Sequence, residues 1–162
     1  MSAIDRILEA NRRFSLDYDP TALSPRPRLR LAVVTCMDTR LSRKSLGLAH
    51  GDAHLIRNAG GIVTDDVVRS LLVSHYLLGT NEFAVINHTD CGLLRSKEEL
   101  QAQIVAKAGL REPVDFHAFA DVEQNARQQA RKLRSLVWVA NEKIIVRGFV
   151  FDVGTGALKE ID

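Results

Sequence analysis

The fold of this chain is decided at residues 33–40, which read VVTCMDTR. The apolar run from Leu29 to Thr35 leads into Cys36, and it lacks the strict alternation of a half-exposed strand. A second stretch, AVINHTDCG at residues 84–92, repeats the arrangement, because its apolar run ends in His88 and Cys91. Parallel strands end at one edge of a sheet, where α/β proteins bind their ligands. If the two strands are neighbours, the three side chains meet at that edge.

Around this pair the sequence alternates between expected strands and expected helices. Apolar runs and turn residues predict strands at residues 29–35, 53–57, 83–87 and 143–151, with a returning edge strand at 157–161. Helical spacing predicts helices at residues 42–47, 64–78, 96–108 and 120–135. This order predicts an α/β fold with a mainly parallel central sheet of four strands, an antiparallel edge strand and helices on both faces.

The first 28 residues stand apart from this pattern. Residues 2–14 carry Ile4, Ile7 and Leu8 at helical spacing behind Ser2 as a cap, and a proline-rich segment follows at 19–27. We therefore predict two parts. Residues 1–28 form an N-terminal helical arm and linker for oligomerisation, and residues 29–162 form the α/β domain that carries the candidate site.

The composition excludes several classes of partner. Of the 162 residues, 46% are hydrophobic and 26% are charged, which is ordinary for one globular domain, and a formal net charge of +2 is too small to indicate a nucleic-acid partner. We find no signal-peptide pattern and no apolar run of about 18 residues, so we expect no membrane contact and a cytoplasmic location. Two cysteines are too few for a disulfide scaffold, and in a reducing compartment they are free to bind a metal as thiolates.

Cys36, His88 and Cys91 are ligand types that zinc prefers. Thiolate sulfur and imidazole nitrogen fill its tetrahedral shell, and a catalytic site keeps one of the four positions open. A purely structural zinc would need a fourth Cys or His, and the available candidates are His50, His54, His75 and His117. We expect His75 to lie on the buried apolar face of its helix and His117 to lie on the protein surface. The sequence therefore predicts one catalytic Zn²⁺ per chain.

Asp38 and Arg40 follow the first cysteine at steps of two residues. An ionised carboxylate at Asp38 can accept a hydrogen bond from a water at the open zinc position, which aims the oxygen lone pair at a substrate. The Arg40 guanidinium can hold that carboxylate as a bidentate pair and keep it ionised. If the pair broke, Asp38 could reach zinc and close the site. The spacing predicts a catalytic group and its restraint.

Residues 58–61, which read NAGG, form a turn that needs glycine torsions or a close backbone approach. Such a turn could cradle an anion at the start of the following helix. It lacks the lysine and hydroxyl residue of a phosphate loop, which disfavours nucleotide binding. We interpret it as a tight turn that lines a substrate pocket at Gly60.

Three blocks taken together resemble the signature of the β-class carbonic anhydrases. They are CMDTR at residues 36–40, IRNAG at 56–60 and HTDCG at 88–92, in the order and at the spacing of that family. The resemblance runs from about Leu31 to Gly92 and more loosely through residues 147–156, and the short chain resembles the compact branch of the family. It implies that Cys36, His88 and Cys91 bind zinc, that Asp38 and Arg40 form the catalytic dyad, and that Gly92 shapes the pocket.

The resemblance also implies an activity and an assembly. The activity is reversible hydration of carbon dioxide to bicarbonate and a proton by a zinc-bound hydroxide. An alternative is hydrolysis of carbonyl sulfide or carbon disulfide at the same site, because the compact branch includes such hydrolases. A third possibility, a zinc-stabilised binding protein without turnover, is disfavoured by the intact Asp38 and Arg40. The family forms homodimers, often paired into tetramers, whose N-terminal helix embraces the partner, and residues 2–14 fit that role.

Overall fold

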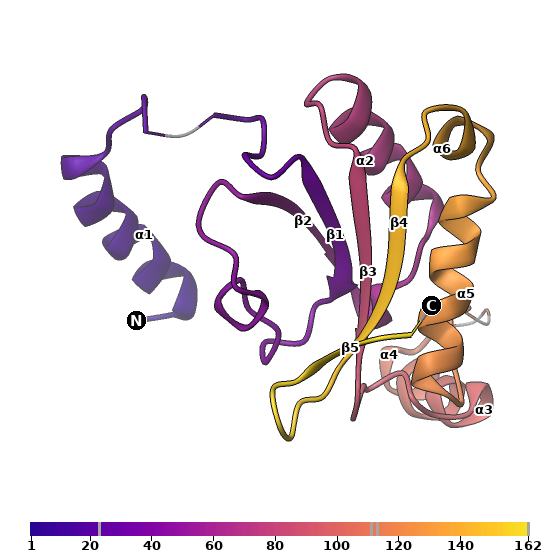
Figure 1. The fold of residues 1–162 in the computed structure, drawn as a ribbon. Helices are drawn as coiled ribbons and strands as arrows, with labels where there is room; N and C mark the ends of the chain where they lie inside the picture. The colour runs from indigo at the N-terminus through magenta and orange to yellow at the C-terminus, as the bar shows by residue number, and fades with distance from the viewer. Residues whose placement is uncertain (23, 111, 113, 162) are drawn as a thin grey trace.

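The centre of the molecule is a five-stranded sheet with the order β2-β1-β3-β4-β5 (Figure 1). The computed structural model describes residues 1–22, 24–110, 112 and 114–161. The strands are β1 (Leu31–Cys36), β2 (Ala53–Asn58), β3 (Glu82–His88), β4 (Ile145–Phe151) and β5 (Leu158–Glu160). The first four run parallel, and β5 is antiparallel to β4. The predicted α/β fold class and its antiparallel edge strand are confirmed.

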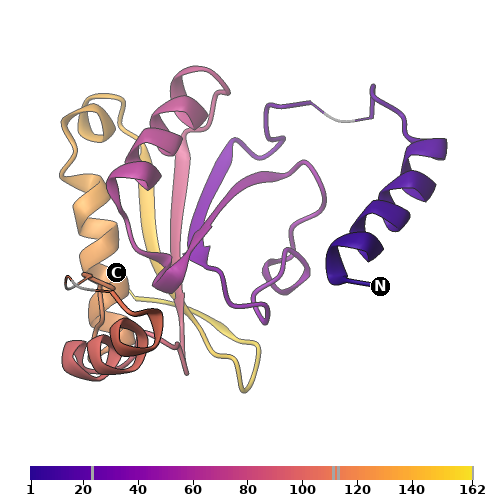
Figure 2. The ribbon, with the colours of Figure 1, turned by 180° about the vertical axis from the view of Figure 1, so that it is seen from behind.

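One face of this sheet is covered by helices. They are α2 (Asp65–Tyr76), α5 (Val122–Arg134) and α6 (Val137–Asn141), and Figures 1 and 2 show them in one layer beside the strands. Their buried residues form the main core with the side chains of alternate strand positions, such as Val34, Val85 and Val146. The strands are apolar at nearly every position, so the side chains that point to the opposite face of the sheet are apolar too.

The opposite face receives much less cover within the chain. Among the described residues, the 3-10 turn η2 (Lys44–Leu46) and the loop around it pack there, against Val33 and Ile86. Helices were expected on both faces of the sheet, and on this face the cover is a 3-10 turn and its loop. The predicted helix at 42–47 stays a single turn because Gly47 adopts a left-handed conformation, with φ at 67°, directly after it.

Capping side chains explain where the longer helices begin. Thr64 accepts a hydrogen bond from the Val67 N–H at the start of α2, and Asp121 does the same for Gln124 at the start of α5. The predicted helix at 96–108 is α3 (Lys97–Leu100), the π-helical stretch η4 (Gln101–Val105) and α4 (Ala106–Ala108) in succession. None of the described helices is long and apolar enough to cross a membrane.

The N-terminal helix α1 (Ala3–Phe14) stands away from the sheet, as Figures 1 and 2 both show. Ser2 caps it together with Asp5, whose side chain accepts from the Ser2 backbone, and the 3-10 turn η1 (Ser15–Asp17) follows. No residue of α1 is buried. The expected helix at 2–14 is confirmed, and its apolar side chains are left in solvent within the single chain.

Candidate metal centre

Two adjacent strands bring the three predicted ligands together. Strand β1 ends at Cys36, β3 ends at His88, and the two strands pair in parallel, with Thr35 beside Ile86. Cys91 lies in the turn directly after β3. One ligand atom from each of Cys36, His88 and Cys91 lies within 4.8 Å of the others, and all three residues are buried. The condition that the two strands be neighbours is met, and the cluster is able to bind a metal ion.

The imidazole of His88 is oriented as a ligand. Its Nδ1 lies 2.8 Å from the carbonyl oxygen of Thr89, and since a carbonyl can only accept, Nδ1 carries the proton. The lone pair is therefore on Nε2, which is buried and has no hydrogen-bond partner among the described residues. An unpaired buried nitrogen is costly unless it binds something. The residues therefore fit a metal ion, with Nε2 as the ligand atom.

The two thiols share one proton in the metal-free protein. A hydrogen bond from Cys91 lowers the pKa of Cys36 despite its burial, and the nearby imidazole of His88 and the backbone around the thiol lower it further. The same bond to Cys36, together with burial, raises the pKa of Cys91. Burial pushes the pKa of His88 down, but the nearby Cys36 and the hydrogen bond that Nδ1–H donates to the Thr89 carbonyl outweigh it and leave the pKa raised. A bound dication would displace the shared proton, since metal ligands must be deprotonated.

Asp38 faces this cluster and is held there by Arg40. The Arg40 Nε and Nη2 atoms donate to the two oxygens of Asp38 at 3.0 and 2.8 Å, and the Arg40 backbone N–H donates at 2.9 Å. These bonds hold the pKa of Asp38 well below its usual range, so the carboxyl is ionised at any ordinary pH. Its Oδ2 lies 3.9 Å from His88 Nε2. A negatively charged acceptor therefore lies beside the ligand cluster.

Sequence reasoning missed two residues around this pair. Asp90 takes the other side of the Arg40 guanidinium, with Nη1 donating to its Oδ2 at 2.8 Å and Nη2 to its carbonyl at 3.0 Å. Arg57 donates to the carbonyl oxygens of Cys36 and Asp38, at 3.0 and 2.5 Å. Arg57 lies in the expected strand at 53–57 and in the block IRNAG, but its targets are backbone carbonyl oxygens, which leave no mark in the sequence.

A cavity of about 370 Å³ opens at the cluster. Cys36, Asp38, Gly60 and Gly92 are among its lining residues, so both glycines predicted for the pocket line it. An apolar part of the lining comes from the helical stretch after the second motif and from the segment before α5, through Leu100, Ile104 and Phe116. The arrangement suits a small apolar substrate that must reach a polar centre.

The remaining histidines lie outside the cluster. His54 contacts Ser74 and the Pro25 carbonyl oxygen, and Nδ1 of His75 contacts the Thr80 carbonyl oxygen at 2.6 Å. His50 and His117 are exposed. Within the described part of the chain, the ligand cluster has three members and no fourth histidine. A structural zinc site needs four protein ligands, and this cluster supplies three.

Comparisons with known proteins agree with this geometry. The sequence model of the carbonic anhydrase family matches residues 31–158. Beta-carbonic anhydrase 1 of Mycobacterium tuberculosis is 42% identical over 137 residues, which are 83% of each chain. The solved carbonic anhydrase of Streptococcus mutans superposes with a TM-score of 0.90 at 39% identity, over 100% of this chain and 99% of that one. A carbon disulfide hydrolase of Acidianus sp. is 48% identical over 83 residues, 51% of this chain and 41% of that protein.

The family match spans most of the chain, and it contains both strand ends that carry the ligand cluster. The chain belongs to the carbonic anhydrase family, in its β class.

Proposed function

We propose that this protein catalyses the reversible hydration of carbon dioxide to bicarbonate and a proton, with one Zn²⁺ per chain held by Cys36, His88 and Cys91. One observation carries the proposal: the buried, unpartnered Nε2 of His88 points into a pair of buried thiols beside an ionised carboxylate. Zinc, when bound there, acidifies a water molecule so that it can react near neutral pH.

The protein's own groups then prepare the reacting water. Asp38 is ionised and can only accept, so a water that donates a hydrogen to it turns a lone pair toward the cavity. Arg40 keeps the carboxylate in that place and away from the ligand cluster. Gly60 and Gly92 line the cavity, and Gly92 leaves room there for a linear triatomic substrate, since nothing lies within 4 Å of the position of its missing Cβ. In this proposal Asp38 and Arg40 form the catalytic dyad.

Hydrolysis of carbonyl sulfide or carbon disulfide is the second candidate. Two observations favour it: the apolar wall of the cavity, and the 48% identity to a carbon disulfide hydrolase over half of this chain. The ligand cluster and the dyad serve either substrate, because both are linear molecules with an electrophilic carbon. The difference must therefore come from access and fit along the wall.

Kinetics on purified protein separates the candidates. We expect carbon dioxide hydration, followed by stopped flow, to exceed sulfide release from carbonyl sulfide or carbon disulfide, and sulfide release as the faster reaction would reverse the ranking. For the dyad, Asp38→Ala should lower the hydration rate by about 10² or more while the zinc content stays at one per chain. Full activity in that variant would remove Asp38 from the mechanism.

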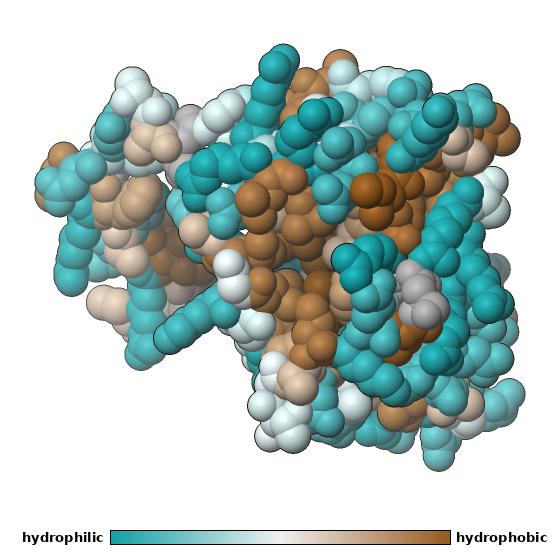
Figure 3. All heavy atoms as spheres, viewed as in Figure 1, coloured by the Kyte–Doolittle hydropathy of each residue, from teal (hydrophilic) through white to brown (hydrophobic). Residues whose placement is uncertain are grey.

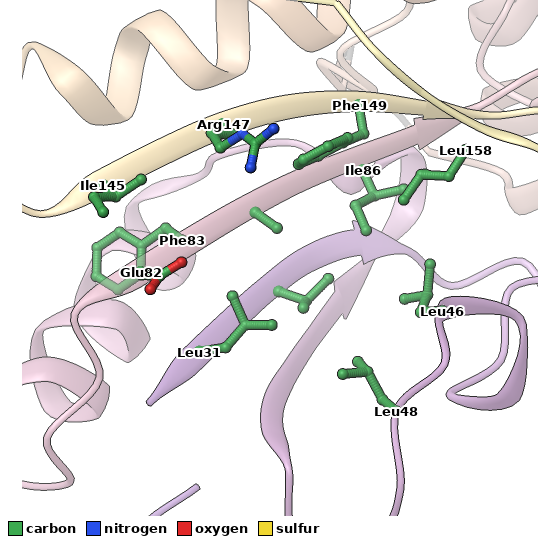
Figure 4. Close-up of a pocket in the computed structure, with 12 residues that line it drawn as sticks. Leu31, Leu46, Leu48, Glu82, Phe83, Ile86, Ile145, Arg147, Phe149 and Leu158 are labelled. Atoms are coloured by element: carbon green, nitrogen blue, oxygen red, sulfur yellow. The ribbon is translucent and has the colours of Figure 1, made fainter. Parts of the chain in front are cut away.

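Two unpartnered apolar surfaces support a homodimer. On α1, Ile4, Ile7 and Leu8 are 70%, 67% and 54% exposed. On the sheet face that lacks long helices there is a hollow of about 220 Å³. Figure 4 shows that side chains from β1, β3, β4 and η2 surround it. Figure 3 shows apolar atoms gathered over the strands on this side. We infer that residues 1–28 serve oligomerisation by covering apolar surface of a second copy, and that residues 29–162 form the catalytic domain.

The proposed ligands also bear on location. Two thiolates on one metal need a reducing environment, where they are not lost to a disulfide, and both cysteines are free in the structure. We therefore place the protein in the cytoplasm, acting on small molecules.

A further inference from the structure

A turn that lines the cavity through Ala59 and Gly60 is held by a chain of side-chain amides from outside the site. The turn comprises η3 (Ala59–Gly61) and the residues up to Val63. Asn87, one residue before the ligand His88, donates through Nδ2 to the carbonyl oxygen of Gly60 at 2.7 Å. Asn125 of α5 donates to Asn87 Oδ1 at 3.1 Å, and Gln129 donates to Asn125 Oδ1 at 3.0 Å. The Val63 backbone N–H donates to Gln129 Oε1 at 2.9 Å.

This chain of amides begins at Val63 and ends at Gly60, on the same turn. Both ends require the hydrogen bonds to run from donor to acceptor in the same direction along the chain. The Val63 N–H can only donate, so Gln129 must present its oxygen to it. The Gly60 carbonyl can only accept, so Asn87 must present its NH₂ group. Between these ends each amide then accepts from one neighbour and donates to the next. Asn87 and Asn125 are almost completely buried, at 0% and 5% exposure, so these bonds do not exchange with solvent.

Close packing shows why the turn needs such a hold. Gly60 and Gly61 have φ of 78° and 63°, in the left-handed region. A Cβ on Gly61 would lie 2.9 Å from Asn87 Nδ2 and 3.0 Å from the backbone nitrogen of Cys36. The turn is thus pressed against the end of β1, directly at the ligand residue Cys36.

We propose that Asn87, Asn125 and Gln129 are positioning residues of the metal centre, which hold the Gly60–Gly61 turn against the Cys36 end of β1 and so fix the place of the ligand sulfur. This amide clasp, defined as these three side chains, touches neither substrate nor metal. It acts through the turn, because the Gly60 carbonyl oxygen that Asn87 binds belongs to the Gly60–Gly61 peptide group, and Gly61 packs against the backbone of Thr35 and Cys36. Partners of this kind commonly change metal affinity or activity by about 10–100-fold.

The inference rests on the proposed zinc site, and two carboxylate variants test it. Asn125→Asp cannot donate to Asn87, so the direction of the chain is lost while all three ligands remain. Gln129→Glu still accepts from Val63 but cannot donate to Asn125, and because Gln129 is only half-buried this variant is expected to fold. Gln128→Glu makes the same chemical change on the exposed side of the same helix and serves as the matched control.

Zinc affinity is measured for each protein by competition with a chromophoric chelator. We expect the dissociation constant to rise by about 10–100-fold in Asn125→Asp and by a smaller factor in Gln129→Glu. Gln128→Glu should stay within about twofold of the wild type, as surface changes do. If the wild type binds no zinc, the proposed function fails. If the wild type binds zinc and both clasp variants match Gln128→Glu, the clasp fails and the function stands.

A spectroscopic measurement separates positioning from general loss of stability. In the cobalt-substituted protein, a turn that no longer holds the Cys36 end of β1 changes the position of the sulfur relative to the metal, so the thiolate-to-cobalt charge-transfer band should shift in both clasp variants and keep its wavelength in Gln128→Glu. Amide exchange in the metal-free protein should quicken at Val63 and Gly60 in the same variants. An unchanged band together with unchanged exchange would overturn the inference even if the variants were less stable.

Discussion

At the scale of single residues, the close approach of the turn to β1 makes a prediction about glycine. A Cβ at Gly61 would meet backbone atoms of β1 at 3.0 Å and would also carry the left-handed strain. We expect Gly61→Ala to lower the free energy of unfolding by about 3 kcal/mol or more, and to lower zinc retention, because strain and overpacking add.

Gly47 provides the control for that change. It has a similar φ of 67°, but nothing lies within 4 Å of the position of its missing Cβ. Gly47→Ala should therefore cost only the conformational strain of about 1–2 kcal/mol and leave metal binding intact. Urea unfolding and metal analysis measure both variants, and equal losses in the two would mean that the close approach at Gly61 does not exist.

The two carboxylates on Arg40 are predicted to matter unequally. Asp38 has a side chain 20% exposed and faces the ligand cluster, whereas that of Asp90 is 79% exposed on the outer side of the guanidinium. Exposed ion pairs contribute about 1 kcal/mol or less, so Asp90→Asn should lower the hydration rate by no more than about fivefold. Asn also tolerates the positive φ of 53° at this position.

Comparing the hydration rates of Asp90→Asn and Asp38→Ala tests that prediction. Stopped-flow hydration rates of Asp90→Asn and Asp38→Ala, measured at equal zinc content, should differ by more than tenfold. If Asp90→Asn were as damaging as Asp38→Ala, the restraint on Arg40 would come mainly from the exposed carboxylate, and the description of Arg40 as primarily bound to Asp38 would be wrong.

At the scale of secondary-structure elements, the anchor of the N-terminal linker predicts a pH dependence. The backbone N–H of Ala49 donates to Asp52, and so does the guanidinium of Arg28, which lies in the linker. Both bonds favour the charged carboxyl and lower its pKa, with the Ala49 bond the stronger cause. The stabilisation is therefore fully present above the unfolded pKa of about 4 and is lost as the pH falls through the lower folded value.

Urea unfolding of metal-free protein measures this effect. The difference in unfolding free energy between the wild type and Asp52→Ala should be constant from about pH 6 to 8 and should shrink as the pH falls below about 4. Asp17→Ala, which removes an exposed carboxylate from η1, should show a much smaller difference at every pH. A difference that grows toward acid pH would mean that the charged form of Asp52 is not the stabilised one.

The elements also show what the sequence can and cannot predict. Strand ends and their ligands were predictable, because Cys36 and His88 each follow an apolar run and parallel strands end at one edge. Helix α6 was missed, since it has five residues, starts without a side-chain cap at Leu136, and lies just after α5. The amide clasp joins α5, β3 and the turn through tertiary contacts between ordinary polar residues, which have no local signature.

At the scale of the whole molecule, the two faces of the sheet are covered unequally, and a single chain leaves one apolar face partly exposed. The helices bury one face, while the other keeps a hollow lined by Leu31, Val33 and Phe149. A monomer would also expose the apolar stripe of α1. Closed oligomers of identical chains most often have twofold symmetry, in which each copy gives and receives the same contact. A dimer in which apolar surfaces of the two copies cover one another resolves both exposures.

Removing the arm or its apolar stripe tests this assembly. We expect light scattering coupled to size exclusion to give a dimer, or a multiple of one, for the full chain, and a smaller species or aggregates for a chain lacking residues 1–22. Ile4→Lys with Ile7→Lys should act like the deletion, because two charges would enter an apolar contact. Glu9→Lys with Arg12→Glu, which exchanges charges elsewhere on the same helix, should leave the mass unchanged. A monomeric wild type, or a double-lysine variant with the wild-type mass, would show that α1 does not hold the copies together.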